Sequence, residues 1–511
     1  MGCFSVATPL TPLGDIIHEK QPTSHPTVKR CKLRKKTQSI AKRTRQKRKQ
    51  QVTAQKRSDT ALIYEMYTTI HHHFPALFTQ MREIDEVRTN ACDYELAAHL
   101  TAGLALFLFK LGSRNQWNQK RKKRQFQKNY EKLLGFAMPH GDSINAVIER
   151  LDEDQLEWLK QQMIRALLER KVFRSSRYRG KWYCIAIDGS GVASFDHQHC
   201  EQCLHKTSKK GKTTWSHQVL DARLVTPKGF SISLATVWIE NPDGGDYKKQ
   251  DCERKAFQRL AAKLHKVFPR LPILLLADGL YPYEGFFQAC RDYGWEFMTT
   301  FKAGNLSSVW EEVETLKLLQ SDQQRTDTYY RPLPDGQITT YREYQWVTGL
   351  DYQGHKLYWV HNRETTIRQH HHQAKGVITL KYDQNDFVHI SSLPVNPKNV
   401  AATSQTARLR WKVENEGFNT LKNGGYGMEH KWARKSYQAM KNYYQFMQMA
   451  HLIHQLMLKR KTFGDTWLKG SNHPTVKSLW EDLLGAMQWS NVKRKRLRNI
   501  LAVPIQFRIA T

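Results

Sequence analysis

Apolar residues follow a helical period from about residue 60 to about residue 176 and a strand period through much of the chain that follows. Between residues 60 and 176 they recur every three or four positions, as in 91–107 and 156–168. This spacing places them on one buried face of a helix. It predicts an all-helical domain over residues 58–177.

From about residue 180 the pattern is that of strands. Three segments rich in β-branched and aromatic residues lie close together, as hairpin-linked strands do. A helix, a strongly apolar run typical of a strand buried on both faces, a second helix and another strand follow. These segments are 181–187, 218–225, 230–239, 254–268, 271–277, 283–293 and 295–302. The predicted order is β-β-β-α-β-α-β, within the first part of an α/β core over 178–304.

A second region of alternating residues lies between this core and the C-terminal helices. Alternation with Pro-Asp-Gly and Tyr-Gln-Gly turns predicts a β-rich insertion over 305–385. A last core strand at 387–393 leads into helices at 400–422 and 434–460, so the second part of the core spans 386–460. Residues 461–511 read as a basic helical tail, with a Lys/Arg cluster at 493–498.

The charge of the chain indicates a polyanionic partner. The chain has 80 Lys and Arg against 47 Asp and Glu, a formal net charge of +33, which excludes an ordinary acidic enzyme. Neutralising phosphates releases counterions, so nucleic acid is the expected partner. Residues 27–57 hold 14 Lys or Arg and no acidic residue. We expect residues 1–57 to be a disordered arm that either grips phosphates or is a solvated charge run.

The number of cysteines and the length of the apolar runs indicate the cellular compartment. Eight cysteines in 511 residues are too few for a disulfide scaffold. The first residues lack the basic start and apolar core of a secretory signal. The longest nearly apolar run, 96–109, is shorter than the roughly 20 residues that cross a bilayer. We expect a reducing, intracellular location and no membrane span.

One basic cluster inside the helical region carries interleaved aromatics, Trp117 and Phe126. Such a pattern suits a DNA-backbone surface, although a solvated helix face has the same composition. The candidate DNA contacts are Lys120, Arg121, Lys122, Lys123 and Arg124.

Two predicted core strands end in Asp-Gly, at Asp188 and at Asp278. Each alone is an ordinary strand-to-turn signal. A carboxylate at the end of a buried strand needs a partner, and two on neighbouring strands form a natural site for a divalent cation such as Mg²⁺. A third carboxylate, Glu414, lies on a predicted helix one turn after Arg410. Taken alone, that spacing also fits a stabilising ion pair.

The three carboxylates in this element order resemble the DDE transposases of bacterial insertion sequences. The matching segments are Ala-Ile-Asp188-Gly-Ser-Gly, Leu-Ala-Asp278-Gly-Leu-Tyr and Arg410-Trp-Lys-Val-Glu414-Asn-Glu-Gly-Phe-Asn-Thr-Leu-Lys422, within residues 178–430. The family signature is Tyr-x2-Arg-x3-Glu-x6-Lys. Here Ala407 stands at the Tyr position and the Lys comes one residue late. Glu416 is therefore an alternative third carboxylate, and Arg410 at the expected spacing favours Glu414.

The resemblance implies an α/β fold, with a ribonuclease H-like mixed sheet flanked by helices and a β insertion between the second Asp and the Glu. It implies two Mg²⁺ or Mn²⁺ ions held by Asp188, Asp278 and Glu414, with Arg410 and Lys422 on phosphates near the cut. The partners would be double-stranded DNA, as terminal inverted repeats and target, and a second subunit when two ends are paired. The location would be the bacterial cytoplasm, at the nucleoid. Alternatives are a DNA-binding protein of transposase descent that no longer cuts, and a nuclease that does not join.

Histidines and cysteines gather after the first Asp, in Asp196-His-Gln-His-Cys-Glu-Gln-Cys-Leu-His205. Cys200, Cys203, His199 and His205 are candidate ligands of a structural zinc ion. There is no second Cys-x2-Cys, so a metal-free hairpin loop near DNA is the alternative. The runs 71–73 and 370–372, three histidines each, are expected to be exposed and without a ligand role.

Overall fold

The computed structural model describes residues 60–89, 93–241, 252–372, 377–430, 432–433, 435–469, 473–503 and 508. The chain divides into two compact units, Met1–Ser58 and Asp59–Thr511, and every described residue belongs to the second. The basic arm predicted over residues 1–57 lies outside the described residues.

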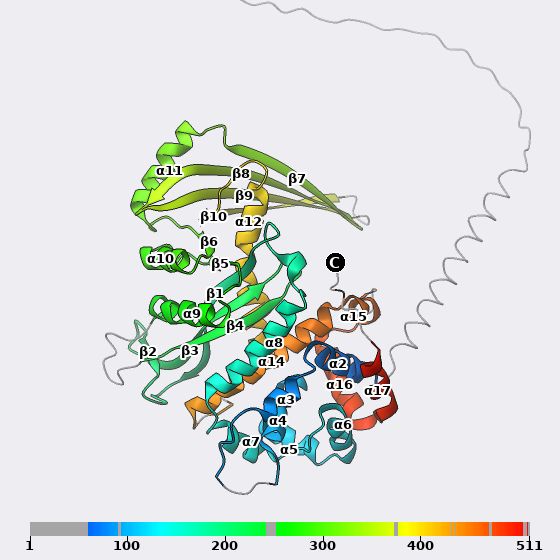
Figure 1. The fold of residues 1–511 in the computed structure, drawn as a ribbon. Helices are drawn as coiled ribbons and strands as arrows, with labels where there is room; N and C mark the ends of the chain where they lie inside the picture. Colours follow the sequence, from blue (N-terminus) through cyan, green and yellow to red (C-terminus); the bar gives the residue numbers. More distant parts are fainter. Residues whose placement is uncertain are drawn as a thin grey trace, which may run out of the picture. The chain divides into compact units, whose positions relative to one another are not determined.

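A ten-stranded mixed sheet forms the second unit's centre (Figure 1). Its strands are β1 (Tyr183–Phe195), β2 (Leu204–Thr207), β3 (Thr213–Val225), β4 (Ser231–Ile239), β5 (Ile273–Ala277), β6 (Glu296–Thr300), β7 (Gln324–Leu333), β8 (Gly336–Tyr352), β9 (His355–His372) and β10 (Val377–Ser391). The order is β2-β3-β1-β5-β6-β10-β9-β8-β7, and β4 also pairs with β3. Among the strands of the described residues, only β1 with β5 and β5 with β6 are parallel. The fold is therefore α/β, with a mostly antiparallel sheet.

The predicted order of core elements is present. Helices α9 (Glu253–Val267) and α10 (Glu284–Asp292) connect β4, β5 and β6. Figure 1 shows these two helices on one side of the core strands, with α8 (Glu153–Glu169) and α14 (Tyr437–Lys459) on the other. All five residues of β5 are buried, because parallel strands flank it and helices cover both faces. The short strand β2 was not predicted, since only one of its four residues is buried.

The residues of the predicted insertion extend the same sheet. Strands β7 to β10 form an antiparallel meander, and β10 pairs with β6 through His389 opposite Thr300. The strand expected at 387–393 is thus the end of the long β10. The region opens with a helix, α11 (Ser307–Leu319), to which the sequence pattern assigned no element.

Helices from both ends of the described unit pack together. The expected helices before the sheet are α2 (Ala61–His73), α3 (Leu77–Arg82), α4 (Leu96–Leu108), α5 (Arg114–Arg121), α6 (Arg124–Leu134), α7 (Gly141–Ile148) and α8, and those after it are α12 (Val400–Ala407), α13 (Asn419–Asn423), α14, α15 (Lys461–Phe463), α16 (Val476–Trp489) and α17 (Arg494–Ala502). The amide of Asn129 in α6 donates to the carbonyls of Met487 and Ser490, at 3.0 and 2.6 Å. Within the described residues, no helix combines the length and apolarity needed to cross a bilayer.

A buried polar network fixes α14 on the sheet. Arg223 and Asp221, both on β3 and fully buried, form an ion pair at 2.6 Å. Arg223 also donates to Gln448 of α14 at 3.0 Å, and Tyr444 of α14 donates to Asp221 at 3.2 Å. A buried ion pair repays its desolvation only when its remaining hydrogen bonds are made. The register pairs Asp221 with Asp188 of β1, so this network lies beside the strand that carries the first predicted carboxylate.

Candidate active site

Asp188 and Asp278 lie on adjacent parallel strands. The last paired residues of β1 and β5 are Ala186 and Leu276, and each Asp follows two residues later. Asp278 comes directly after β5, where its Oδ1 accepts the backbone N–H of Leu280 at 2.9 Å. The register therefore brings the two carboxylates side by side.

The prediction that β1 ends at Asp188 is wrong. Beyond Asp188 the strand continues to Phe195, paired with β3 as far as Trp215. Its other neighbour, β5, has already ended at Ala277. Asp188 is thus held by continuous backbone pairing on one side and faces an open edge on the other. Such an edge gives a rigid carboxylate access to a ligand.

Glu414 joins the two Asp side chains in one cavity. A cavity of about 480 Å³ is lined by Asp188, Gly189, Ser190, Asp278, Arg410, Glu414, Asn415, Phe418, Asn419 and Lys422. Arg410 donates to Asp188 Oδ2 at 3.0 Å. The alternative carboxylate, Glu416, accepts from Lys412 at 2.6 Å and does not line this cavity. All five residues predicted for the reaction centre, the three carboxylates with Arg410 and Lys422, are therefore brought together.

The helix that carries Glu414 is irregular, and this irregularity accounts for the position of Lys422 relative to Glu414. After α12 comes a 3₁₀ turn, η3 (Arg408–Arg410), and then a π-helix, η4 (Val413–Phe418), before α13. A π-helical turn closes with an i→i+5 bond and so takes up one residue more than an α-helical turn. Lys422 follows the π-helix one residue later than in the signature that the sequence resembles, and it still lines the cavity.

The electrostatics of the cavity favour a cation. Burial raises the pKa of Asp188 to about 6, although the charge of Arg410 opposes this shift, and the charges of Asp278 and Glu414 add to it. Three carboxylates facing one another hold protons or positive ions more readily than they stay empty. Their oxygen atoms suit hard divalent cations such as Mg²⁺ and Mn²⁺. The residues present therefore fit a metal of that type, with Asp188, Asp278 and Glu414 as ligands.

A fourth carboxylate, Glu253, was missed by sequence reasoning. It begins α9, and burial together with the charges of Asp188 and Asp278 raises its pKa to about 7. Its side chain occupies the space over Gly189, where a Cβ atom would lie 2.5 Å from Glu253 Oε1. A glutamate in the first turn of a helix ordinarily complements the helix dipole. No local signal distinguished Glu253 from that common role.

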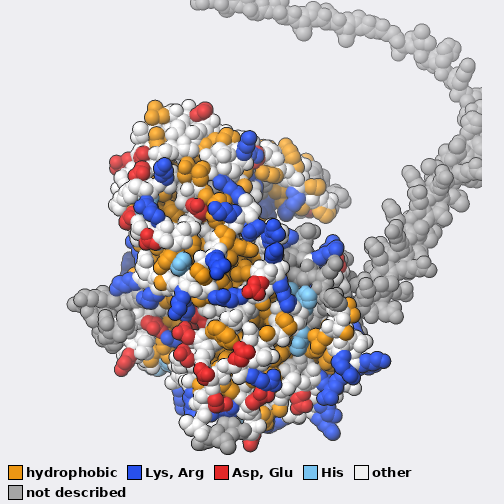
Figure 2. Space-filling model, in the orientation of Figure 1, with side chains coloured by type: hydrophobic (Ala, Val, Ile, Leu, Met, Phe, Trp, Pro, Cys, Tyr) orange, Lys and Arg blue, Asp and Glu red, His pale blue; other side chains and the backbone are white. Residues whose placement is uncertain are grey.

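The five predicted DNA contacts of the helical region have different environments. Lys122, Lys123 and Arg124 are exposed, whereas Lys120 donates to Gln488 at 3.0 Å and Arg121 donates to the carbonyl of Met138 at 2.9 Å. The interleaved aromatics Trp117 and Phe126 are fully buried, so they belong to the core and cannot stack on bases. Figure 2 shows lysine and arginine side chains gathered over the face that α6 and α17 form.

The cysteine and histidine cluster forms with one change of partner. The ligand atoms of His199, Cys200, Cys203 and His217 all lie within 4.8 Å of one another, and this group can hold a metal ion. His217, on β3, takes the place predicted for His205, whose ring lies 5.3 Å from that of Trp215. Hydrogen bonding with Cys200 and His217 lowers the pKa of the Cys203 thiol, and thiolate is the form that binds metals.

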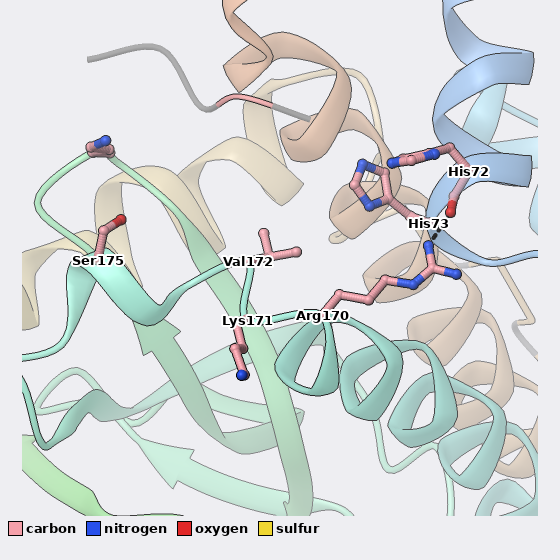
Figure 3. Close-up of a pocket in the computed structure, with 7 residues that line it drawn as sticks. His72, His73, Arg170, Lys171, Val172 and Ser175 are labelled. Atoms are coloured by element: carbon pink, nitrogen blue, oxygen red, sulfur yellow. Dashed lines mark hydrogen bonds between the residues drawn. The ribbon is translucent and has the colours of Figure 1, made fainter. Parts of the chain in front are cut away.

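A basic pocket of about 370 Å³ lies where α2 and α8 end (Figure 3). It is lined by His72, His73, Arg170, Lys171, Val172, Ser175 and Lys228, and Arg170 donates to the carbonyl of His72. The expectation that residues 71–73 are exposed is wrong for His73, which is only 2% exposed. Burial lowers the pKa of His73 to about 3. His73 is therefore neutral at physiological pH, and the pocket's charge comes from Arg170, Lys171 and Lys228.

Comparison with known proteins finds no family model that matches the chain and no curated protein that matches it. The geometry of the carboxylate cavity and of the cysteine and histidine cluster must therefore carry any functional conclusion.

Proposed function

We propose that this protein is a DDE-type DNA transposase with a ribonuclease H-like core. It would bind the terminal inverted repeats of its element, cut the DNA strands and join them to a target. The observation that carries the proposal is the convergence of Asp188, Asp278 and Glu414, from three distant segments, in one cavity with Arg410 and Lys422. The order β-β-β-α-β-α-β around them supports the same class, as does the net charge of +33.

The residues of the cavity would have two roles, as metal ligands and as contacts to DNA phosphates. Asp188, Asp278 and Glu414 would hold two Mg²⁺ or Mn²⁺ ions in this cavity. When bound, such ions lower the pKa of an attacking water or DNA 3′-hydroxyl and stabilise the leaving oxygen. Arg410 now neutralises part of the charge on Asp188 at 3.0 Å. Once cations take over that role, Arg410 would be available to hold phosphates in line for attack, together with Lys422, which pairs with Glu429 at 3.0 Å.

The remaining features of the proposal follow from the reaction. Pairing two DNA ends requires a second copy of the chain, so we propose a homodimer at that stage. A chromosomal substrate places the protein at the nucleoid, in the bacterial cytoplasm. Thiolates and imidazoles favour a softer ion than carboxylates do, so zinc is proposed for the Cys200 and Cys203 cluster, without a part in DNA cleavage.

The test is a cleavage and joining assay with the full-length protein. The substrate would be a supercoiled plasmid that carries the repeats flanking the gene, with Mg²⁺ or Mn²⁺. Asp188→Asn, Asp278→Asn and Glu414→Gln should each reduce cleavage at least about 100-fold, because each removes a metal ligand, while DNA binding persists. Glu416→Gln, the matched control, should retain cleavage.

The assay also separates the alternatives. Cleavage without joined products would identify a nuclease. Binding without cleavage by the unaltered protein would identify a DNA-binding protein of transposase descent. Full cleavage by Asp188→Asn would refute the proposed centre.

A further inference from the structure

We propose that His199, Cys200, Cys203 and His217 bind a single Zn²⁺ ion in a closed, structural site. The inference does not depend on the proposed DNA chemistry. His217 supplies the fourth ligand from β3, so the site joins a loop to a strand rather than closing within one loop.

The distances between ligand atoms match a zinc tetrahedron. With Zn–S bonds of about 2.3 Å and Zn–N bonds of about 2.0–2.1 Å, a regular tetrahedron has S···S, S···N and N···N edges of about 3.8, 3.5 and 3.3 Å. Cys200 Sγ and Cys203 Sγ are 3.9 Å apart. His217 Nε2 lies 3.6 and 3.5 Å from these two sulfurs, and 3.3 Å from His199 Nδ1. Four of the six edges therefore agree within 0.2 Å with those of a bound ion.

A disulfide does not explain this arrangement. A disulfide requires a sulfur separation of about 2.05 Å, and Cys200 and Cys203 are both free thiols. Reduced thiols packed as ordinary core residues would not require two imidazole nitrogens to point at the same place. Zn²⁺ is the ion that this mixed sulfur and nitrogen donor set favours.

The surroundings assign the ion a structural role. Cys203 and His217 are fully buried, and aromatic rings cover both histidines. Phe195 stacks on His199 with ring centres 4.4 Å apart, and Tyr437 stacks on His217 at 4.0 Å. Four protein ligands leave no open coordination position for a substrate, which is the hallmark of structural zinc.

The position of the site shows what the ion would hold. The loop between β1 and β2 supplies three ligands, and His217 pairs with Ala193 near the end of β1. Tyr437 is the first residue of α14. The ion would therefore fasten the loop after β1 to β3 and, through the stacking of Tyr437 on His217, to the start of α14. Ala193 is five positions after Asp188, about 16 Å along the strand, so the ion lies well away from the carboxylates.

The first experiment measures zinc in full-length protein produced without a histidine tag, by mass spectrometry of the metal. After loading with one equivalent of Zn²⁺ and dialysis, we expect one zinc per chain. Cys203→Ser and His217→Gln should lose most of it, whereas His205→Gln and Asp188→Asn should keep it. Absence of zinc from the loaded protein, or loss with His205→Gln but not with His217→Gln, would overturn the proposal.

Because His217 is buried, its variant can fail to fold, so a second measurement uses the unaltered protein. X-ray absorption at the zinc edge should give two sulfur neighbours at about 2.3 Å and two nitrogen neighbours at about 2.0 Å. A shell of four light atoms, or a single sulfur, would overturn the assignment. This readout is indifferent to DNA cleavage, so it separates failure of the zinc site from failure of the proposed transposase.

Discussion

The carboxyl group of Asp188 is in an environment that neither simple burial nor a simple ion pair describes. Its partner Arg410 lies at 3.0 Å, yet its pKa is raised to about 6, because burial and the charges of Asp278 and Glu414 outweigh that attraction. Glu253 nearby has a pKa raised to about 7. In the metal-free protein, these two groups take up protons as the pH falls from neutral toward 6.

Metal binding at the carboxylates should therefore depend steeply on pH. Below pH 6 Asp188 is protonated, and a metal ion must displace that proton. The affinity for Mn²⁺ should fall about tenfold per pH unit there and level off above about pH 7.5. Calorimetric titration of the full-length protein with Mn²⁺ between pH 5.5 and 8.5 would measure this. Affinity that stays constant over the range would contradict the assignment of Asp188 as a ligand.

Single residues show both the reach and the limit of sequence reasoning. Asp188, Asp278 and Glu414 stand in motifs with recognisable neighbours, so the amino-acid sequence alone is enough to select them. His217 and Glu253 could not be selected in this way, because each looks locally ordinary, an inward position of a strand and a first-turn glutamate. His205 was chosen instead of His217 for its nearness in sequence. Pairing of β2 with β3 sets His205 opposite Trp215, away from the cysteines.

At the scale of elements, the neighbouring strands and helices determine where a strand ends or a helix becomes irregular. The Asp-Gly pair at 188–189 carries a turn signal, yet β1 continues because it pairs with ten residues of β3, from Leu224 to Trp215. The length of a partner strand is not written in the local pattern. The π-helix η4 was equally hidden, and the displaced Lys422 was its only trace in the sequence. Element types were thus predictable in the core, whereas their ends were not.

The π-helix yields a test of Lys422. If η4 returns this side chain to the cavity, Lys422→Gln should weaken binding of duplex DNA and reduce the slope of log K against log salt by about one. Lys412→Gln is the matched control. Lys412 lies on the same irregular helix and pairs with Glu416 at 2.6 Å, outside the cavity, so it should change the slope little. Equal effects of the two substitutions would show that the cavity has no special part in DNA binding.

At the scale of the whole described unit, long-range pairing joins what the sequence divides. The predicted insertion shares one sheet with the core through β6 and β10. Helices from both ends of the unit share one layer, as the hydrogen bonds of Asn129 with Met487 and Ser490 show. The period of the apolar residues shows which face of a helix or strand is buried. It does not show which other element covers that face. The fold class and the core order were therefore accessible from the sequence, and the contacts between its parts were not.

Net charge is a property of the whole molecule, but DNA binding depends on which exposed basic residues contact the phosphates. Lys122, Lys123 and Arg124 are exposed where α5 meets α6, whereas Lys120 and Arg121 are engaged in contacts within the protein. Replacing the three exposed residues by alanine should weaken DNA binding at low salt. It should also reduce the salt slope by about 2.7, since each phosphate contact contributes about 0.9.

The matched control removes the same charge elsewhere. Lys266, Arg270 and Lys356 are also exposed, and they lie in the last turn of α9, beyond its end, and on β9. Their triple alanine variant has the same net charge as the first, so any difference between the two reports position rather than total charge. Fluorescence anisotropy of a labelled duplex over 50–200 mM salt, the range in which counterion release is steep, would measure both. If the two slopes fall alike, binding follows net charge alone and the surface over α5 and α6 is not a DNA interface.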